Sequence, residues 1–390
     1  MGATPLRAQT FFSRATGVAE HYGFCNVDDL AIKERATHAA DALETPATEQ
    51  GMYDHHVVAH ALARLAESVE FKKRNAVMFY TPSVLRDPAR PGNTISALTL
   101  NAVGSSDPLS EIVTLRCAAS ILSELGARQP VVRVNSLGDS DSAARFVREV
   151  GNHLRTRMRE LPEGYPELMK HDIKSAIASL YEARHPITDD LPRPIEFLTA
   201  PSRRHFKEIL ELLEQAELPF ELDDRLYGNQ SMYAHTIVEF VDAAEETPTA
   251  RVVLARGGRY DALTRAYARS TIPATGIVIA SETKDAPKAM GRTRSKRASA
   301  CLVHIGREAR IKSIGIIETF RQAKIPLEQC LHFERFSEQI AYAEALGAKH
   351  ILIIGQREAQ EGIAIVRDTA NRSQHTVSLT ALPEFVRSAA

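Results

Sequence analysis

Apolar residues recur every three to four positions in two long segments of the first third of the chain. In Thr10–Tyr22 they occupy positions 11, 12, 15, 18, 19 and 22, and in Ser110–Leu125 positions 112, 115, 118, 119, 122 and 125. This spacing is typical of amphipathic helices. Each segment is followed by a glycine, Gly23 or Gly126, the usual residue just past a helix end. The pattern therefore predicts two helices.

Short apolar runs without helical spacing predict buried strands. Asn75–Leu85 and Leu98–Val103 flank a stretch rich in proline and glycine, so we expect them to pair as a hairpin. Val131–Val134 predicts another buried strand. Val252–Leu254 predicts a strand that ends in Gly-Gly, with a helix beginning shortly afterwards.

Two further segments are polar and mostly helical in pattern, Ala36–Glu70 and Asp139–Ala216. His56 and His60 in the first segment have the spacing of a helical metal pair, but no third ligand stands in a known arrangement. We expect these two histidines and His55 to be solvated or capping residues, and we predict no metal site. Acids are interleaved with the basic residues of the second segment, which favours a solvated helical face there.

Residues 301–390 alternate between strand and helix patterns, which predicts a small mixed or parallel sheet with helices on its faces. The segment before them, 284–300, is polar and carries six Lys and Arg residues, and we interpret it as a linker. The expected strands are Cys301–Ile305, Leu327–Cys330, His350–Ile354, Gly362–Arg367 and Gln374–Ser378, and the expected helices are Arg307–Ala323, Phe336–Leu346 and Leu382–Ser388.

Composition narrows the class of protein. A chain of 390 residues with 44% apolar residues suggests two or three domains with real cores. The chain has 48 Lys and Arg residues and 49 Asp and Glu residues, so its net charge does not attract nucleic acid. Binding to nucleic acid would require a local patch of basic residues. The four cysteines form no metal spacing and predict buried thiols in a reducing compartment. We expect a soluble, cytoplasmic protein with no membrane partner.

The stretch ARGGRYDAL concentrates side chains suited to a binding site. Gly257 and Gly258 permit backbone conformations closed to other residues, or a close approach to something bound. Arg259, Tyr260 and Asp261 then offer a cation, a phenol and a carboxylate, which could form one wall of a pocket. A strand–turn–helix joint with a buried Arg–Asp pair is the alternative interpretation.

Several segments, in order along nearly the whole chain, resemble the histidyl-tRNA synthetase family of class II synthetases. The matching segments are YGF at Tyr22–Phe24, VGSSDPL at Val103–Leu109, VNSLGD at Val134–Asp139, ELDDRL at Glu221–Leu226, GGRYDAL at Gly257–Leu263 and PATG at Pro273–Gly276. The resemblance implies an α/β fold of the α+β type, with a class II antiparallel sheet flanked by helices. It divides the chain into a core at 1–283 with a helical insertion at about 139–219, a basic linker at 284–300 and an anticodon-binding-like α/β domain at 301–390.

The resemblance also implies partners. In the family, a strand after the first helix builds a homodimer interface, and Asn26–Ile32 corresponds to it here. The C-terminal domain implies tRNA or another RNA as a ligand. Known non-catalytic relatives of this fold make a protein partner a further expectation.

Most charged groups with which the family activates histidine are replaced. Arg86 matches the motif 2 arginine that holds the ATP α-phosphate, but the motif 2 glutamate position is Pro88. Ala97 and Asn101 replace the glutamine and glutamate that face ATP and the histidine ammonium. An amide cannot supply the charge that a carboxylate gives to an ammonium group. Thr283 stands where motif 3 has its arginine.

The histidine loop is also degenerate. The family's Arg-Gly-Leu-Asp-Tyr-Tyr-Thr-Gly segment falls on Gly228–His235, so the catalytic arginine is Gly228 and the aspartate is Ser231, while Tyr233 is retained. His55–Ala59 replaces a family segment whose acid and hydroxyl help to hold the substrate amino group.

Removing one preorganised donor from a site of this kind typically costs ~10²–10³ in rate. We therefore expect a non-catalytic binding or regulatory module, with no catalytic residue and no cofactor, that holds tRNA, a histidine-like ligand or a protein. A divergent but active histidine–tRNA ligase with relocated groups is the alternative. The candidate ligand pocket comprises Arg86, Tyr233, Gly257, Gly258, Arg259, Tyr260 and Asp261.

Overall fold

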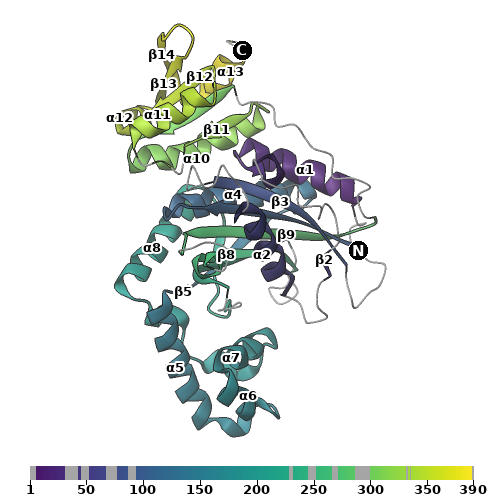
Figure 1. Cartoon of the computed structure of the whole chain (residues 1–390). Coiled ribbons are helices and arrows are strands. Elements are labelled where there is room, and N and C mark those ends of the chain that lie inside the picture. Colours follow the sequence, from purple (N-terminus) through teal and green to yellow (C-terminus); the bar gives the residue numbers. More distant parts are fainter. Residues whose placement is uncertain are drawn as a thin grey trace.

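The computed structural model arranges the chain as two β-sheets with a layer of helices between them (Figure 1). It describes residues 6–30, 43–44, 52–66, 77–86, 94–227, 232–244, 252–265, 271–285, 299–330, 333 and 335–388. Within these ranges, no helix combines the length and the apolar character needed to cross a bilayer.

The larger sheet contains nine strands among the described residues. Their order is β1 (Cys25–Asn26), β3 (Val77–Arg86), β4 (Thr94–Val103), β9 (Ala274–Thr283), β8 (Val253–Arg259), β7 (Ala234–Asp242), β5 (Pro130–Gly138) and β6 (Phe220–Leu222), with β2 (Leu43–Glu44) beside β3. The strands from β3 to β5 in this order are all antiparallel to their neighbours. β1, β2 and β6 join in parallel. The predicted antiparallel sheet and its β3–β4 hairpin are confirmed.

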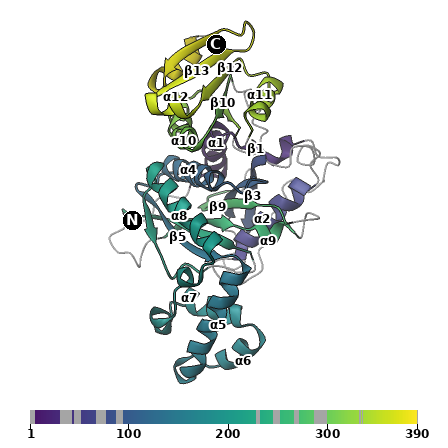
Figure 2. The same ribbon diagram turned by 90° about the vertical axis from the view of Figure 1, so that its left-hand side faces the viewer.

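One face of this sheet is covered by α1 (Ala8–His21), α4 (Pro108–Leu125) and α8 (Ala200–Gln215), which share an apolar core with the strands (Figure 2). α4 begins where the Asp107 carboxylate accepts a hydrogen bond from the Leu109 amide at 3.0 Å. It ends at Gly126, whose φ of 112° suits glycine. The two predicted amphipathic helices are confirmed, and each begins two residues earlier than predicted.

The opposite face carries α2 (Met52–Ala66) and the first helices of the segment predicted as an insertion, α5 (Ser140–Thr156), α6 (Tyr165–His171) and α7 (Ile173–Glu182), whereas α8 of the same segment lies on the face of α1 and α4. The insertion extends away from the sheet at the end opposite the second sheet (Figure 1). Aromatic rings anchor it to the core, because Tyr181 of α7 stacks on Tyr227 with ring centroids 5.1 Å apart. Phe146 of α5 lies 5.6 Å from the same ring. The predicted helix-rich character of this region is confirmed.

The second sheet has the order β11 (Leu327–Gln329), β10 (Ala300–His304), β12 (His350–Ile354), β13 (Ile363–Asp368) and β14 (Gln374–Ser378). β11 and β12 flank β10 in parallel, whereas β13 and β14 are antiparallel. Its helices are α10 (Arg307–Gln322), α11 (Phe336–Ala345), α12 (Gln356–Glu361) and α13 (Leu382–Ser388). The predicted mixed sheet is confirmed. The sequence did not predict α12, because its segment QREAQE has no apolar periodicity.

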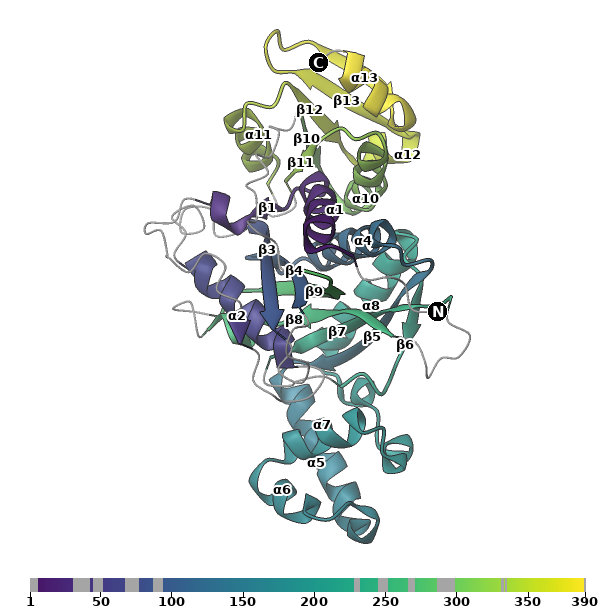
Figure 3. The ribbon, with the colours of Figure 1, turned by 90° about the vertical axis from the view of Figure 1, so that its right-hand side faces the viewer.

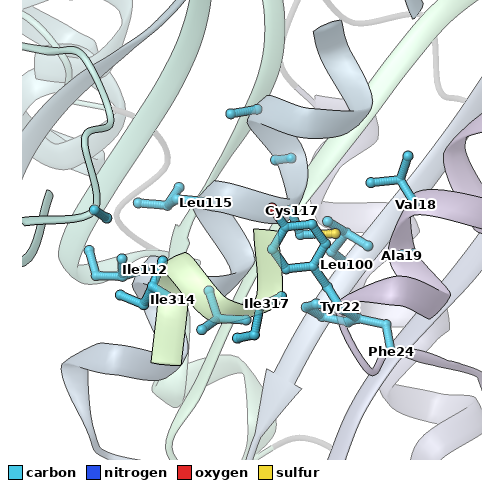
Figure 4. Packing of buried hydrophobic residues seen from close by; sticks show 14 of the residues in the cluster. Val18, Ala19, Tyr22, Phe24, Leu100, Ile112, Leu115, Cys117, Ile314 and Ile317 are labelled. Atoms are coloured by element: carbon cyan, nitrogen blue, oxygen red, sulfur yellow. The ribbon is translucent and has the colours of Figure 1, made fainter. Parts of the chain in front are cut away.

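The two sheets are joined through a continuous apolar core between α10 and the helices α1 and α4 (Figure 3). Ile314 of α10 lies beside Ile112 of α4, and Ile317 lies near Tyr22 and Cys117 (Figure 4). The Tyr22 hydroxyl donates a hydrogen bond to Glu318 at 2.5 Å, and the Tyr22 carbonyl accepts one from the Gln329 side chain at 2.7 Å. Arg310 of α10 pairs with Asp107 at the start of α4. The apolar contact between the two sheets is therefore flanked by hydrogen bonds and an ion pair.

One prediction about the N-terminal region needs correction. Asn26–Ile32 is not a continuous strand, because β1 covers only Cys25–Asn26 and a 3₁₀ turn follows at Val27–Asp29. The Asn26 side chain accepts a hydrogen bond from the Asp28 amide at 3.0 Å, which favours a turn over a strand. The described part of Ala36–Glu70 is mostly helical as predicted, since it consists of α2 and the two-residue strand β2, and the rest of the segment lies outside the described residues. Residues 286–298 of the predicted linker lie outside the described residues.

Candidate functional site

The two glycines of GGRYD lie inside β8 rather than at its end, which corrects the predicted strand boundary. Gly257 faces β9 so closely that a Cβ atom on it would lie 2.2 Å from the Gly276 carbonyl oxygen. Gly258 faces β7 in the same way, with the Thr236 carbonyl oxygen 2.3 Å from such an atom and a φ of 148°. Both glycines are therefore required by close contact between neighbouring strands.

Arg259, the last residue of β8, is held between two carboxylates. Its Nη1 lies 3.0 Å from Glu111 Oε1, and its Nε lies 3.0 Å from Asp261 Oδ2. Arg259 is only 4% exposed and Glu111 only 2%. Charged hydrogen bonds of this length in a buried setting are strong, so the guanidinium is already committed to protein partners.

Glu111 has a second basic neighbour. His205 of α8 places its Nε2 2.9 Å from Glu111 Oε1. Although burial raises the pKa of Glu111, the contact with His205 and the charge of Arg259 outweigh it and bring the pKa down to about 2. The ring of His235 lies 5.6 Å from that of His205, and burial, followed by the charge of His205, lowers the pKa of His235.

Sequence reasoning missed Glu111, His205 and His235. A signal for Glu111 was present, because an acid at position 111 occupies the same helix face as the apolar Leu115 and Ala118. A carboxylate on the buried stripe of an amphipathic helix requires a buried cation. The identity of that cation could not be inferred, since 148 residues separate Glu111 from Arg259.

Tyr260 and Asn101 form a fully buried neutral pair. The Tyr260 hydroxyl donates a hydrogen bond to Asn101 Oδ1 at 2.6 Å. Burial raises the pKa of Tyr260, which therefore stays protonated as the donor. Asn101 Nδ2 has no hydrogen-bond partner among the described residues. A neutral amide thus occupies the place where the resemblance implies a glutamate facing an ammonium group.

Thr283 is the last residue of β9, and its hydroxyl group is held by hydrogen bonds within the protein. It lies opposite Thr94 of β4, which in turn lies opposite Arg86 of β3, so the two positions that the family fills with arginine are separated by one strand. Thr283 is buried, and its Oγ1 lies 3.0 Å from Ser96 Oγ and 3.1 Å from the Asp285 carbonyl oxygen. The side chain of Arg86 is outside the described part of the structure.

Tyr233 lies on the face of the large sheet opposite α1 and α4, in the same apolar cluster as Val57 and Val58 of α2. These two valines belong to the positions that replace the family's acidic and hydroxyl segment, and both are buried. Apolar packing therefore occupies part of the face on which the resemblance places a substrate. Three positions singled out from the sequence, Pro88, Gly228 and Ser231, lie outside the described residues.

The structure brings Gly257, Gly258, Arg259, Tyr260 and Asp261 together around the β8–β9 pair. Asp261 Oδ1 accepts a hydrogen bond from the Ala274 amide at 2.8 Å, so this carboxylate also ties β9 to the turn after β8. Across the described ranges, no group of three or more His, Cys, Asp or Glu side chains could hold a metal ion.

Comparisons with known proteins agree with this architecture. A family profile described as "Anticodon binding domain" matches residues 300–389. The histidine–tRNA ligase of Geobacillus thermodenitrificans is 27% identical over 291 residues, which are 74% of this chain and 68% of that protein. The histidine–tRNA ligase of Acholeplasma laidlawii is 26% identical over 289 residues, 73% of this chain and 68% of that protein.

Two solved structures are also similar. The histidyl-tRNA synthetase of S. aureus matches with a TM-score of 0.43 and 18% identity, over 80% of this chain and 77% of that one. An ATP phosphoribosyltransferase regulatory subunit/histidyl-tRNA synthetase from Bacillus halodurans C matches with a TM-score of 0.45 and 14% identity, over 91% and 98%.

The antiparallel sheet flanked by helices is followed by a C-terminal domain that matches the anticodon-binding profile. Over 74% of its length the chain is similar to histidine–tRNA ligases, in agreement with the resemblance that the sequence motifs indicated.

Proposed function

We propose that this protein is a non-catalytic binding or regulatory module built on the histidyl-tRNA synthetase-like fold. The observation that carries the proposal is the ion-paired triad of Arg259, Glu111 and Asp261, in which the buried arginine of GGRYD is held at Nη1 by Glu111 and at Nε by Asp261. Adenylation needs cations free to hold phosphate and a carboxylate free to hold an ammonium group. In this chain Arg259 could not replace the arginine missing at position 228.

The neighbouring substitutions point in the same direction. Asn101 is neutral and is engaged by Tyr260, and Thr283 is buried among hydroxyls. The family's side chains, a glutamate at position 101 and an arginine at position 283, would have to displace these contacts. The proposed ligand site comprises Arg86, Tyr233 and the segment 257–261. Arg259 supports this site structurally and does not bind the ligand through its charge.

A divergent, active histidine–tRNA ligase is the second candidate. It is favoured by the names of the curated relatives, which are histidine–tRNA ligases, and by the retention of Arg86 at the motif 2 position. The two candidates differ in whether the chain joins an amino acid to AMP.

Pyrophosphate exchange separates the two candidates. The full chain is incubated with ATP, labelled pyrophosphate and each of the twenty amino acids in turn. The binding module gives no exchange above the enzyme-free background with any of them. Exchange with histidine would overturn the proposal and support the ligase, and a histidine–tRNA ligase prepared in parallel serves as the positive control.

Binding is then measured by calorimetry with histidine, ATP and bulk tRNA as separate probes. A heat of binding with tRNA, in the absence of exchange activity, supports an RNA-binding module. If none of the three probes gives a heat of binding, a protein partner is the remaining expectation. The proposal includes a homodimer, the division into a core at 1–283, a linker at 284–300 and a C-terminal domain at 301–390, and a cytoplasmic location. Light scattering at micromolar concentration tests the dimer.

A further inference from the structure

Two of the four cysteines lie against each other inside the second sheet. The Sγ atoms of Cys301 on β10 and Cys330 just after β11 are 3.5 Å apart, and both residues are fully buried. β10 and β11 are parallel, with Cys301 opposite Glu328. Cys330 follows two residues later, so both thiols project from the same face of the sheet as diagonal neighbours.

The surroundings of this pair favour a sulfur–sulfur bond over other uses of two thiols. Both thiols belong to a small apolar cluster with Val303, Ala343 and Ile351. No third metal-ligating side chain joins them within the described residues. The contact with Cys330, followed by burial, raises the pKa of the Cys301 thiol, so the closed fold keeps this thiol protonated.

Access to the thiols depends on α11, which covers this cluster. α11 has ten residues, and only Gln339 and Ala343 are buried in it. Phe336 at its start is 41% exposed. Gln339 hydrogen-bonds the backbone of His304 on β10 at 3.0 Å in both directions, so local opening of α11 must release these contacts but leaves the strand pairing of the sheet in place. Opening of α11 would expose both sulfurs together without separating β10 from β11.

We propose that Cys301 and Cys330 are the site of an intramolecular disulfide, formed when a peroxide reaches them through opening of α11. Once exposed, one thiol loses its proton to water, the thiolate sulfur attacks hydrogen peroxide and the O–O bond breaks, so that a sulfenic acid forms and the leaving hydroxide takes up a proton to become water. The second thiol then attacks the sulfenic sulfur, the S–S bond forms and a second water leaves. The sulfurs need to approach by about 1.5 Å to reach bonding distance.

The bond would tie the end of β11 to β10. That end matters because Gln329, the residue before Cys330, donates the buried hydrogen bond to the Tyr22 carbonyl. Oxidation would therefore fix the strand through which the second sheet contacts α1. This inference is independent of the proposed function.

The test uses the full reduced chain, treated with hydrogen peroxide under native conditions, alkylated in denaturant and digested with trypsin. The expected result is a loss of two of the four thiols, with a mass lower by two hydrogen atoms and no added oxygen. Peptides 298–307 and 325–335, which carry Cys301 and Cys330, should be found linked. Four alkylated cysteines, or sulfinic acid at single cysteines, would overturn the proposal.

Variants sharpen the assignment. Cys25→Ser should still lose two thiols, whereas Cys301→Ser and Cys330→Ser should each lose none to an internal bond. The same oxidation in denaturant is the comparison for chance pairing. If the native chain gives the same mixture of pairs with Cys25 and Cys117 as the denatured chain does, the fold does not direct the bond and the proposal fails.

Discussion

At the scale of single residues, the ion pairs of Arg259 provide the sharpest test of how the site is held together. Arg259→Ala would leave Glu111 buried with one of its two basic partners, His205 being the other, removed. Breaking a buried pair on one side typically costs about 3–5 kcal/mol of unfolding free energy, and we expect a loss of this size in urea unfolding monitored by circular dichroism.

Arg148→Ala is the matched control, because Arg148 pairs with Glu149 at 3.3 Å but its side chain is 70% exposed. An exposed pair of this kind contributes about 0–1 kcal/mol. Equal losses in the two variants would contradict the structural role assigned to Arg259.

The pH dependence of stability is a second prediction at this scale. The pKa of Glu111 falls from an ordinary 4.5 to about 2 in the folded chain. Between these values the unfolded chain takes up a proton that the folded chain does not, so stability is lost as the pH falls from 4.5 toward 2. The slope from this group approaches 1.4 kcal/mol per pH unit.

Glu111→Gln removes this titration, and the free energy of unfolding should then depend less on pH in that window. The measurement is a series of urea unfolding curves from pH 5 downward for both proteins. Identical slopes in the two proteins would show that Glu111 has an ordinary pKa in the fold.

At the scale of elements, the close packing of β8 between β7 and β9 depends on side chains being absent. Gly257→Ala would place a methyl group 2.2 Å from the Gly276 carbonyl oxygen, which is backbone and cannot rotate away. We expect a loss of about 1–3 kcal/mol or more, as for other overpacked sites.

Gly315→Ala in α10 is the matched control, because nothing lies within 4 Å of the new atom. Alanine is the better helix former, so this change should stabilise the chain by about 0.5–1 kcal/mol. The thermal midpoints of the two variants should therefore move in opposite directions, and a shared direction would argue against close strand contact at position 257.

Elements defined by local periodicity were predictable from the sequence, whereas their pairing was not. The stripe of Ser110–Leu125 predicted α4, and the apolar runs around the Pro/Gly-rich stretch predicted β3 and β4. Gly257 and Gly258 were taken as a strand end, because a single sequence does not show that neighbouring backbones come within touching distance there. The Tyr260–Asn101 pair was missed for the same reason, since it joins residues 159 positions apart.

At the scale of the whole molecule, the shared core of α1, α4 and α10 predicts that both sheets unfold together. Ile317 is fully buried in that core. Ile317→Ala should cost about 2–5 kcal/mol and should lower a single transition seen by both calorimetry and far-ultraviolet circular dichroism. Ile305→Ala, at a position that is 43% exposed, is the control and should change little. Two separated transitions in the unaltered chain would contradict the shared core.

The contact between Tyr22, Cys117 and Ile317 also bears on how the chain can be handled in the laboratory. A fragment that ends before residue 300 would expose the apolar faces of α1 and α4 that α10 covers in the full chain. We expect such a fragment to aggregate or to stay bound to chaperones in the cell. Either part is therefore best produced within the full-length chain, or by co-expression of the two fragments so that each covers the apolar surface of the other.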